Sequence, residues 1–224
     1  MTLTAHTISG APRPWRALLG LTFKGLNYQT HYLEASKAEH KAPAFLKLNP
    51  RGKVPVLETG DLILRDSIGI LAWLDRQYPD RPLFGETADE AARIWQVTMA
   101  CCDYLRAAGQ RLLFPILVLN EPLPVPGSDE MTALKAAGEA MHAECRYLET
   151  LLDGNSYLSG SRPSAADAVA FPEIRLMQRG LERKADHMAA AGFDNPAELY
   201  PRVAEWKVRV GAIEGVDTTL PIHW

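Results

Sequence analysis

The sequence of 224 residues predicts an α/β domain followed by an all-helical domain. The first eighty residues alternate short strand-like runs with helical runs, whereas from Thr87 onward only helical periodicity is found. Between them lies Pro79-Asp-Arg-Pro82, and proline lacks the amide hydrogen that a helix or strand needs. We therefore expect an α/β domain over residues 1–80 and a helical domain over residues 87–224.

The N-terminal domain begins with the order of a βαβ unit. Alternating residues predict strands over Leu3–Ile8 and Tyr28–Leu33, and apolar residues at helical spacing predict a helix over Trp15–Leu26. Two further strand-like runs, 54–57 and 62–64, flank a turn that contains glycine, which predicts a β-hairpin.

The remaining helices follow from periodicity and caps. We expect helices over residues 67–78, 88–119, 129–152, 164–188 and 197–210. Ser164 and Asp167 have the spacing of a capping box, in which each residue satisfies an amide of the other, and this motif carries no catalytic meaning by itself.

Composition excludes several classes of protein. Lys and Arg number 24 against 27 Asp and Glu, so a net charge of −3 does not favour a nucleic-acid partner. No apolar run reaches the roughly 18 residues of a membrane span, and the N-terminus lacks a signal-peptide pattern. Three cysteines, two of them adjacent, form no disulfide framework or metal-binding pair, which favours the cytoplasm and no metal.

Residues 39–67 contain the candidate binding residues. Pro55 cannot donate a hydrogen bond to a neighbouring strand, so the Val54-Pro55 edge either binds the backbone of an extended peptide or only discourages aggregation. Asp66 and Ser67 open a helix, where they either bind an anion with the free amides or simply cap the helix. His40, Lys41 and Lys53 add donors or positive charge, and each alone is more typical of solvated surface.

These residues resemble a known family. The order βαβ, Asn-Pro-x-Gly-Lys-Val-Pro-x-Leu over 49–57, hairpin, acidic residue then Ser, proline-rich linker and helical half is similar to cytosolic glutathione transferases. Residues 39–57 most resemble the phi and theta classes. The resemblance implies a thioredoxin-like fold for the N-terminal domain, a helical bundle for the C-terminal domain, and glutathione as co-substrate.

The resemblance also implies roles for single residues. Pro55 would be cis, and Val54 would pair its backbone with the cysteinyl part of glutathione. Asp66 and Ser67 would hold the γ-glutamyl end, and Asp66 stands where Glu is commoner, which shortens that arm. His40, Lys41 and Lys53 would hold the glycine carboxylate.

The sequence departs from the family at the thiol. Ala11 occupies the position where phi-like patterns carry Ser or Cys, so the expected hydroxyl or thiol is absent. A thiol of pKa ~8.5 must drop about two units to be mostly ionised at pH 7, which takes close to 2.7 kcal/mol, more than a helix dipole alone supplies. Ser9 is our favoured replacement, Arg13 the second and Thr7 a weaker third; Ser9 otherwise only closes a turn with Gly10.

The leading hypothesis is a cytoplasmic, homodimeric glutathione transferase of detoxification type, whose bound thiolate attacks a small, apolar electrophile. The alternatives are a glutathione-dependent isomerase, dehalogenase or lyase, and a non-catalytic glutathione-binding module, which Ala11 favours. Four residues at helical spacing either line the electrophile pocket or, more typically, form core: Trp95, Met99, Tyr104 and Phe114.

Overall fold

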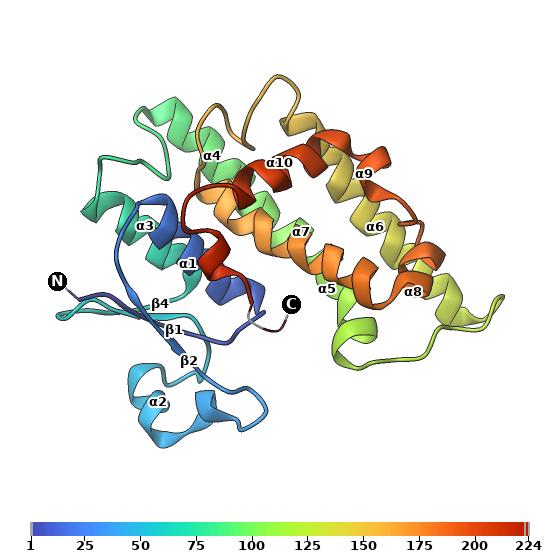
Figure 1. Cartoon of the computed structure of the whole chain (residues 1–224), viewed down its shortest axis with the longest axis horizontal. Coiled ribbons are helices and arrows are strands. Elements are labelled where there is room, and N and C mark those ends of the chain that lie inside the picture. Colours follow the sequence, from blue (N-terminus) through green and yellow to red (C-terminus); the bar gives the residue numbers. More distant parts are fainter. Residues whose placement is uncertain (1, 222, 224) are drawn as a thin grey trace.

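The structure is a computed structural model that describes residues 2–221 and 223. A four-stranded mixed sheet lies at one end of the molecule, and a larger group of helices lies beside it (Figure 1). The strands are β1 (Thr4–Thr7), β2 (Gln29–Tyr32), β3 (Val56–Glu58) and β4 (Ile63–Arg65), in the order β2-β1-β3-β4. β1 and β2 are parallel, and the β1–β3 and β3–β4 pairs are antiparallel.

The sheet is covered on both faces by helices of its own half. α1 (Pro12–Phe23) and α3 (Ser67–Gln77) pack together on the face that meets the helical half, and α2 (Pro43–Leu48) and the turn η1 (Glu39–Lys41) lie on the other face (Figure 1). α1 ends three residues earlier than the predicted helix because Gly25 adopts a φ of 67°, where the amides of Gly25 and Leu26 bond carbonyls of the last turn.

Three of the four helices that the sequence predicts in the helical half are divided into shorter ones. The run predicted over 88–119 is α4 (Ala88–Ala100), the π-helical turn η2 (Cys101–Leu105), α5 (Arg106–Leu113) and a second π-helical turn η3 (Phe114–Val118). Pro115 has no amide hydrogen, and the Leu119 amide bonds the Phe114 carbonyl five residues back instead of four.

The later helices are α6 (Asp129–Leu151), α7 (Ala165–Arg183), α8 (Ala185–Ala190), α9 (Pro196–Leu199) and α10 (Pro201–Gly211), followed by the turn η4 (Asp217–Thr219). The predicted helix over 164–188 is broken at Lys184, and the one over 197–210 is broken before Pro201. A proline disfavours helical dihedrals in the preceding residue, and Tyr200 accordingly has φ −134° and ψ 68°.

The predicted capping box is present at the start of α7. Asp167 Oδ2 accepts bonds from the amide and hydroxyl of Ser164 at 2.9 Å, and Oδ1 accepts from Leu158 N at 3.0 Å and Trp206 Nε1 at 2.8 Å. The buried carboxylate thus ties the start of α7 to α10 and to the loop before it.

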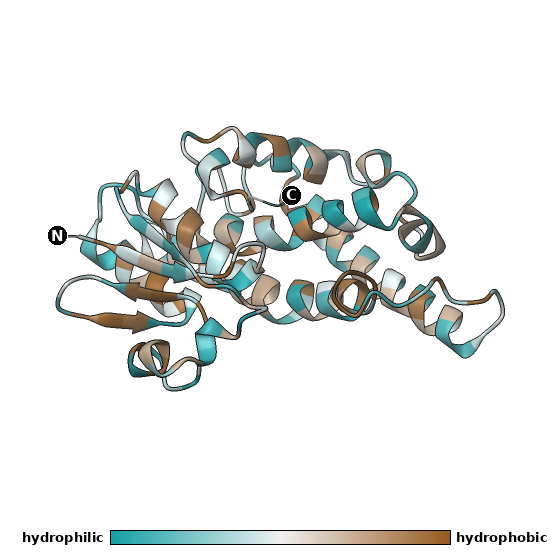
Figure 2. Ribbon diagram, turned by 60° about the horizontal axis from the view of Figure 1, so that its bottom comes forward, coloured by the Kyte–Doolittle hydropathy of each residue, from teal (hydrophilic) through white to brown (hydrophobic). Residues whose placement is uncertain are grey.

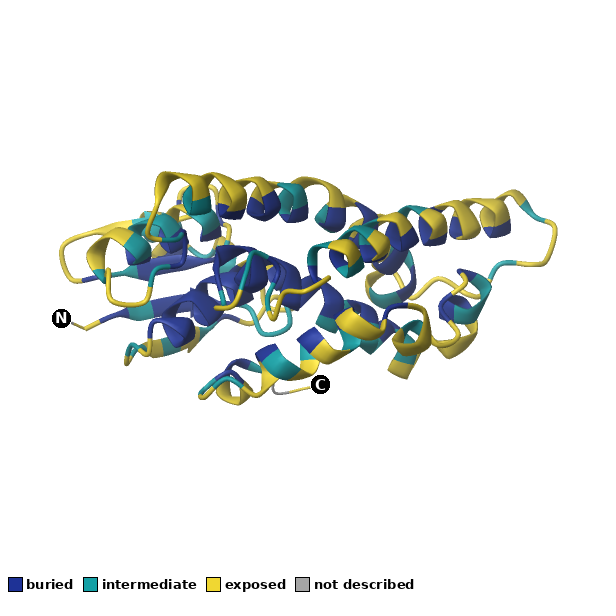
Figure 3. Cartoon of the chain, turned by 90° about the horizontal axis from the view of Figure 1, so that it is seen from above, coloured by how far each residue is buried: buried dark blue, intermediate teal, exposed yellow. Residues whose placement is uncertain are grey.

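Apolar residues fill the interior that both halves share. They concentrate on the strands and on the inward sides of the helices (Figure 2), and most of these positions are buried (Figure 3), whereas Leu62 and Ile63 of the hairpin are exposed. α7 crosses α1 and α4, so the core continues from the sheet into the helical half. This packing fixes the N-terminus of α1 at the junction, which matters for the site below.

Candidate functional site

A cavity of about 540 Å³ opens where the hairpin, the loop before it and the first turns of α1 and α3 meet. Four basic side chains and one carboxylate line it, together with the Val54-Pro55 peptide and Ser67. Six of the nine residues that the sequence singled out are here: Arg13, Lys53, Val54, Pro55, Asp66 and Ser67. A surplus of positive charge in a concave site favours a ligand that carries carboxylates.

The Val54-Pro55 bond is cis, as the resemblance implies. Strand β3 begins only at Val56, so Val54 lies outside the hydrogen-bonded ladder of the sheet. Its backbone borders the cavity and is placed to meet an extended ligand.

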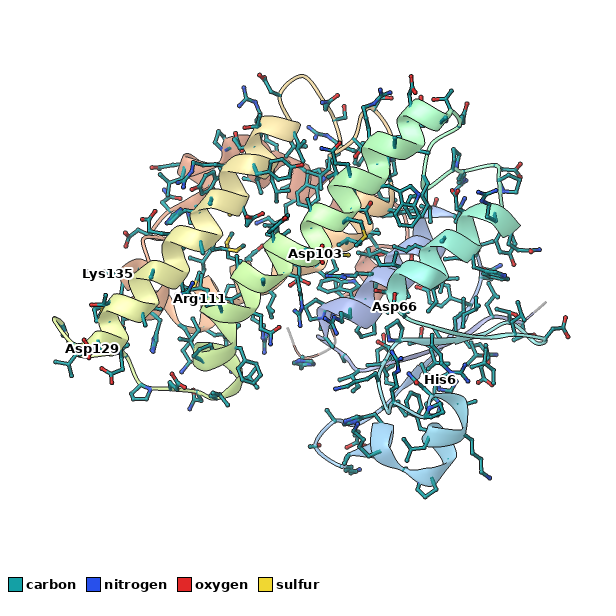
Figure 4. The ribbon with its side chains drawn as sticks, turned by 180° about the vertical axis from the view of Figure 1, so that it is seen from behind. His6, Asp66, Asp103, Arg111, Asp129 and Lys135 are labelled. Atoms are coloured by element: carbon teal, nitrogen blue, oxygen red, sulfur yellow. The ribbon has the colours of Figure 1, made fainter. Side chains whose placement is uncertain are left out.

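Asp66 caps α3. Its Oδ1 accepts the amide hydrogens of Ile68 at 2.9 Å and Gly69 at 3.4 Å, which was one of the two alternatives drawn from the sequence. Asp66 has a φ of 73°, a backbone conformation that favours glycine, and Figure 4 shows it where the hairpin passes into α3. This conformation turns the carboxylate toward the helix amides, while the side chain also borders the cavity.

Ser67 is the first residue of α3 and is 3% exposed. Its hydroxyl forms no hydrogen bond with the residues that the structure describes, yet it lines the cavity. A hydroxyl that borders a cavity and has no protein partner is placed to serve a ligand.

His40 and Lys41 lie in η1, beside the cavity but not in its lining. Gly52 lets this segment come close, because a methyl group on Gly52 would lie 2.8 Å from the His40 carbonyl oxygen and from Lys41 Nζ. Lys41 Nζ donates to the Arg51 carbonyl at 3.3 Å, and His40 Nδ1 is buried without a partner in the described part of the chain. The two residues therefore support the loop that carries Lys53.

Four residues of the lining were not among the site residues predicted from the sequence: Asn49, Pro50, Arg51 and Arg65. Asn49 is buried and folds the loop, since its Nδ2 donates to the Lys53 carbonyl at 2.7 Å and its Oδ1 accepts from the Arg51 amide at 3.1 Å. Arg65 Nε donates to the Leu48 carbonyl at 2.6 Å, which holds the guanidinium at the rim. These residues are next to predicted site residues in the sequence, since 49–51 lie just before Lys53 and Arg65 lies just before Asp66; this proximity could have indicated them.

The start of α1 offers few donors. Ala11 is its N-cap and no side chain caps it, while Pro12 and Pro14 have no amide hydrogen. Among the first three helical residues only Arg13 carries one, and its side chain lines the cavity. Arg13 thus supplies both backbone and side-chain donors at this position.

Ser9, the residue favoured from the sequence, lies outside the cavity lining. Its Oγ is 3.5 Å from Nδ1 of His223, near the C-terminus, a contact that no sequence pattern indicated. Burial and the neighbouring Arg179 lower the pKa of His223, which keeps its imidazole neutral near pH 7.

A buried ion cluster lies behind the site. Arg16, one turn after Arg13, donates to Glu173 Oε1 of α7 at 3.0 Å, and Arg106 of α5 donates to Glu173 Oε2 at 3.2 Å. Arg16 Nη1 also lies 3.5 Å from Cys102 Sγ, a thiol whose pKa burial raises and Arg16 lowers. The thiol is therefore protonated near neutral pH, and the cluster serves to join α1 to the helical half.

The four residues assigned to pocket or core are neither buried nor in this cavity. Trp95, Met99, Tyr104 and Phe114 are 36%, 42%, 67% and 43% exposed, so the core interpretation is wrong for them. They project from α4, η2 and η3 because these elements form an outer layer whose inner sides alone meet the core.

Other kinds of site are absent from the described residues. Within residues 2–221 and 223, no group of three or more His, Cys, Asp or Glu side chains has the arrangement of a metal site. In the same part of the chain, no helix combines the length and hydrophobicity that crossing a bilayer requires.

The fold and the cavity define a thioredoxin-like α/β domain with a helical C-terminal part, and comparisons with known proteins give the family. Residues 11–77 match the family model for the glutathione S-transferase N-terminal domain. A theta-3 glutathione S-transferase of Mus musculus is 31% identical over 221 residues, covering 94% of this chain and 83% of the relative. Glutathione S-transferase 1 of Dianthus caryophyllus is 33% identical over 162 residues, covering 71% and 70%.

A solved structure shares the whole fold. A glutathione S-transferase from the Antarctic clam Laternula elliptica superposes with a TM-score of 0.81 at 24% identity, covering 100% of this chain and 94% of that one. The chain belongs to the cytosolic glutathione transferase superfamily, and it is a glutathione transferase.

Proposed function

We propose that glutathione binds extended in the 540 Å³ cavity and that its thiolate attacks a small, apolar electrophile. The observation that carries this proposal is the meeting of the Val54 backbone, the unpartnered Ser67 hydroxyl and four basic side chains in one concave site. Residues 1–80 form the glutathione-binding domain in this proposal, and residues 87–224 form the helical domain.

The two ends of the tripeptide find different partners. Ser67 and the start of α3 receive the γ-glutamyl carboxylate, because a helix N-terminus attracts anions. Asp66 Oδ1 is used by the helix amides, so the second carboxylate oxygen remains for the ligand amine. Lys53 holds the glycine carboxylate, with Lys41 and His40 behind it supporting the loop.

In this arrangement Arg13 lowers the pKa of the glutathione thiol. Its cation and amide stabilise the thiolate where Ala11 offers no hydroxyl, and a charge-assisted hydrogen bond contributes about 1.5–3 kcal/mol. Ser9, which lies beside His223, is the second candidate. In a substitution, the ionised sulfur forms a bond to the electrophilic carbon, the bond from that carbon to the leaving group breaks, and the leaving group departs with the bonding electron pair while the thiol proton passes to solvent. In an addition, the sulfur bonds to the carbon and the displaced electron pair takes up a proton.

Substitution distinguishes the two candidates. Arg13→Met should raise the thiol pKa of bound glutathione by about one unit or more, since one unit corresponds to 1.36 kcal/mol. Arg13→Lys should restore part of the shift, and Ser9→Ala should change it less. The ultraviolet absorbance of the thiolate, titrated with pH, measures this pKa; if only Ser9→Ala raises it, the role belongs to Ser9.

The outcome of turnover tests the reaction type. Glutathione consumed together with an aryl or alkyl halide indicates conjugation, whereas glutathione recovered unchanged indicates an isomerase, dehalogenase or lyase. Calorimetric binding of glutathione with no thiolate signal and no turnover over a panel of electrophiles would support the non-catalytic alternative and contradict our proposal.

We further propose a cytoplasmic homodimer with a role in detoxification. Exposed apolar side chains of the hairpin and of the α4–η2 segment support the dimer: Leu62, Ile63, Met99 and Tyr104 are 49%, 40%, 42% and 67% exposed. Sedimentation velocity tests the assembly, and Tyr104→Glu with Met99→Glu should shift a dimer to monomers. A monomer in the unmodified protein contradicts it.

A further inference from the structure

Two histidines lie next to each other on the side of the sheet where α2 packs. His6 of β1 and His31 of β2 are paired in register on neighbouring parallel strands, so their side chains leave the same face of the sheet. Their ring centroids are 5.0 Å apart, and the ring of Phe45 in α2 lies 6.0 Å from that of His6. Figure 4 shows His6 on the α2 side of the strands. Neither histidine lines the glutathione cavity, so the pair is a separate feature.

Glu58, the last residue of β3, engages one nitrogen of His6. Its Oε1 lies 2.6 Å from His6 Nε2. An ionised carboxylate only accepts hydrogen bonds, so in the neutral imidazole the hydrogen is on Nε2 and the lone pair is on Nδ1. A carboxylate bonded to one ring nitrogen is the arrangement that orients a histidine whose other nitrogen binds a metal ion.

The second nitrogen of His6 has no protein partner. His6 is 5% exposed, and its Nδ1 is buried without a hydrogen bond to any described residue. Nearly all buried polar atoms in proteins have a partner, so a lone pair in this position indicates a place for a ligand. His31 is exposed and forms no hydrogen bond with the residues that the structure describes. Both rings therefore have a nitrogen available, and the exposed ring gives an ion a path from solvent.

The separation of the two rings suits one ion. A zinc–nitrogen bond is about 2.0–2.1 Å long, so two imidazoles bound to one tetrahedral ion have ring centroids about 5 Å apart. The pair has this spacing. No third His, Cys, Asp or Glu of the described chain completes a metal-binding group here, so water takes the remaining positions. With two protein ligands, the site is weaker than the three- and four-ligand centres of zinc enzymes and zinc fingers.

From this geometry we propose that His6 and His31 together bind one divalent transition-metal ion that prefers imidazole, such as Zn²⁺ or Ni²⁺. Glu58 is a positioning residue, since it acts on the ion through His6. The bound ion links β1 to β2, and its binding does not depend on the glutathione site. The sequence shows no spacing motif for this pair because the whole of α1 separates the two histidines.

Titration calorimetry on the full chain, untagged and freed of metal, tests the proposal. Glutathione is left out because its thiol would bind the ion itself. Zn²⁺ and Ni²⁺ should each bind at submillimolar concentration, and Mg²⁺, which prefers oxygen ligands, should not bind. Absence of binding by both transition metals would overturn the proposal and would leave water as the partner of His6 Nδ1.

Substitutions locate the ion. Glu58→Ala should weaken Zn²⁺ binding about 10–100-fold, as expected when the carboxylate behind a metal-binding histidine is lost, and His31→Ala should weaken it at least as much because a ligand itself is removed. His223→Gln is the matched control, since His223 is another exposed histidine and contacts Ser9 at the far side of the site. Equal losses in His31→Ala and His223→Gln would show that the ion binds surface histidines without selection.

Thermal denaturation supplies a second measurement. An ion that binds only the folded pair raises the melting temperature, so Zn²⁺ should stabilise the unmodified chain and should not stabilise His31→Ala. The melting temperature of His31→Ala without metal verifies that this variant folds. Ser67→Ala should retain Zn²⁺ binding, because Ser67 belongs to the glutathione cavity. If Ser67→Ala abolishes Zn²⁺ binding and His31→Ala does not, the ion occupies the glutathione cavity and the proposal is wrong, whether or not the chain transfers glutathione.

Discussion

The glutathione cavity and the helical half treat their charged groups in opposite ways. In the cavity, Arg13, Lys53 and Ser67 face open space without a carboxylate partner of their own. In the helical half, Glu173 is 1% exposed and accepts from two arginines, and Asp167 is completely buried and accepts four hydrogen bonds. Charged and polar side chains without a protein partner are therefore available to a ligand, whereas the paired and buried ones stabilise the fold.

Arginine illustrates the contrast within one helix. Arg13 and Arg16 are neighbours on α1, yet Arg13 lines the cavity while Arg16 is 3% exposed and ion-paired. The same side chain can serve binding or stability, and its neighbours decide which. Substitutions in the two regions should therefore separate ligand affinity from the free energy of unfolding.

The largest expected effect is at the junction. Glu173→Gln should lower the free energy of unfolding by about 3–5 kcal/mol, because it leaves Arg16 and Arg106 without a counter-charge in a buried place. Urea denaturation measures the loss. Glu182→Gln, which removes an exposed acid of the same helix, should change the free energy of unfolding by less than about 0.5 kcal/mol. Similar losses in both variants would contradict the conclusion that the buried pairs of Glu173 stabilise the fold.

A smaller effect is expected in the cavity. Ser67→Ala should weaken glutathione binding by about 1–3 kcal/mol, since a ligand group loses a hydroxyl partner, with little loss of stability. Titration calorimetry and thermal denaturation separate the two quantities. Unchanged affinity would take Ser67 out of the site.

Acid should weaken the helical half through His142. Burial lowers the pKa of this imidazole below 6.5, so the unfolded chain binds the proton more readily than the folded one. The stability is present at higher pH and falls as the pH drops below about 6.5. His142→Gln should flatten this slope below about pH 6.5, and His31→Gln, at an exposed position, should not. An unchanged slope in His142→Gln would contradict the assignment.

The smallest effect concerns Lys53. Lys53→Met should weaken glutathione binding by about 0.5–1 kcal/mol and should make the remaining affinity less sensitive to salt, because the lost contact is exposed and screened. Titrations at low and high ionic strength measure both quantities. A loss that is the same at every ionic strength would indicate a role in packing instead of charge.

The sequence by itself determined the βαβ order, the hairpin, the helical second half and the Ser164–Asp167 cap. These depend on period, turn chemistry and capping, which act over a few neighbouring residues. It also indicated five residues of the cavity, because Lys53 to Pro55 and Asp66 to Ser67 carry contiguous motifs.

Only the tertiary structure decided how distant segments meet. It brought Arg13 to the cavity and Ser9 to His223, paired Arg16 with Glu173, and left Met99 and Tyr104 exposed. Such contacts join residues far apart in the chain, so their burial and pairing are set by the packing of whole helices, and no local pattern of residues encodes them.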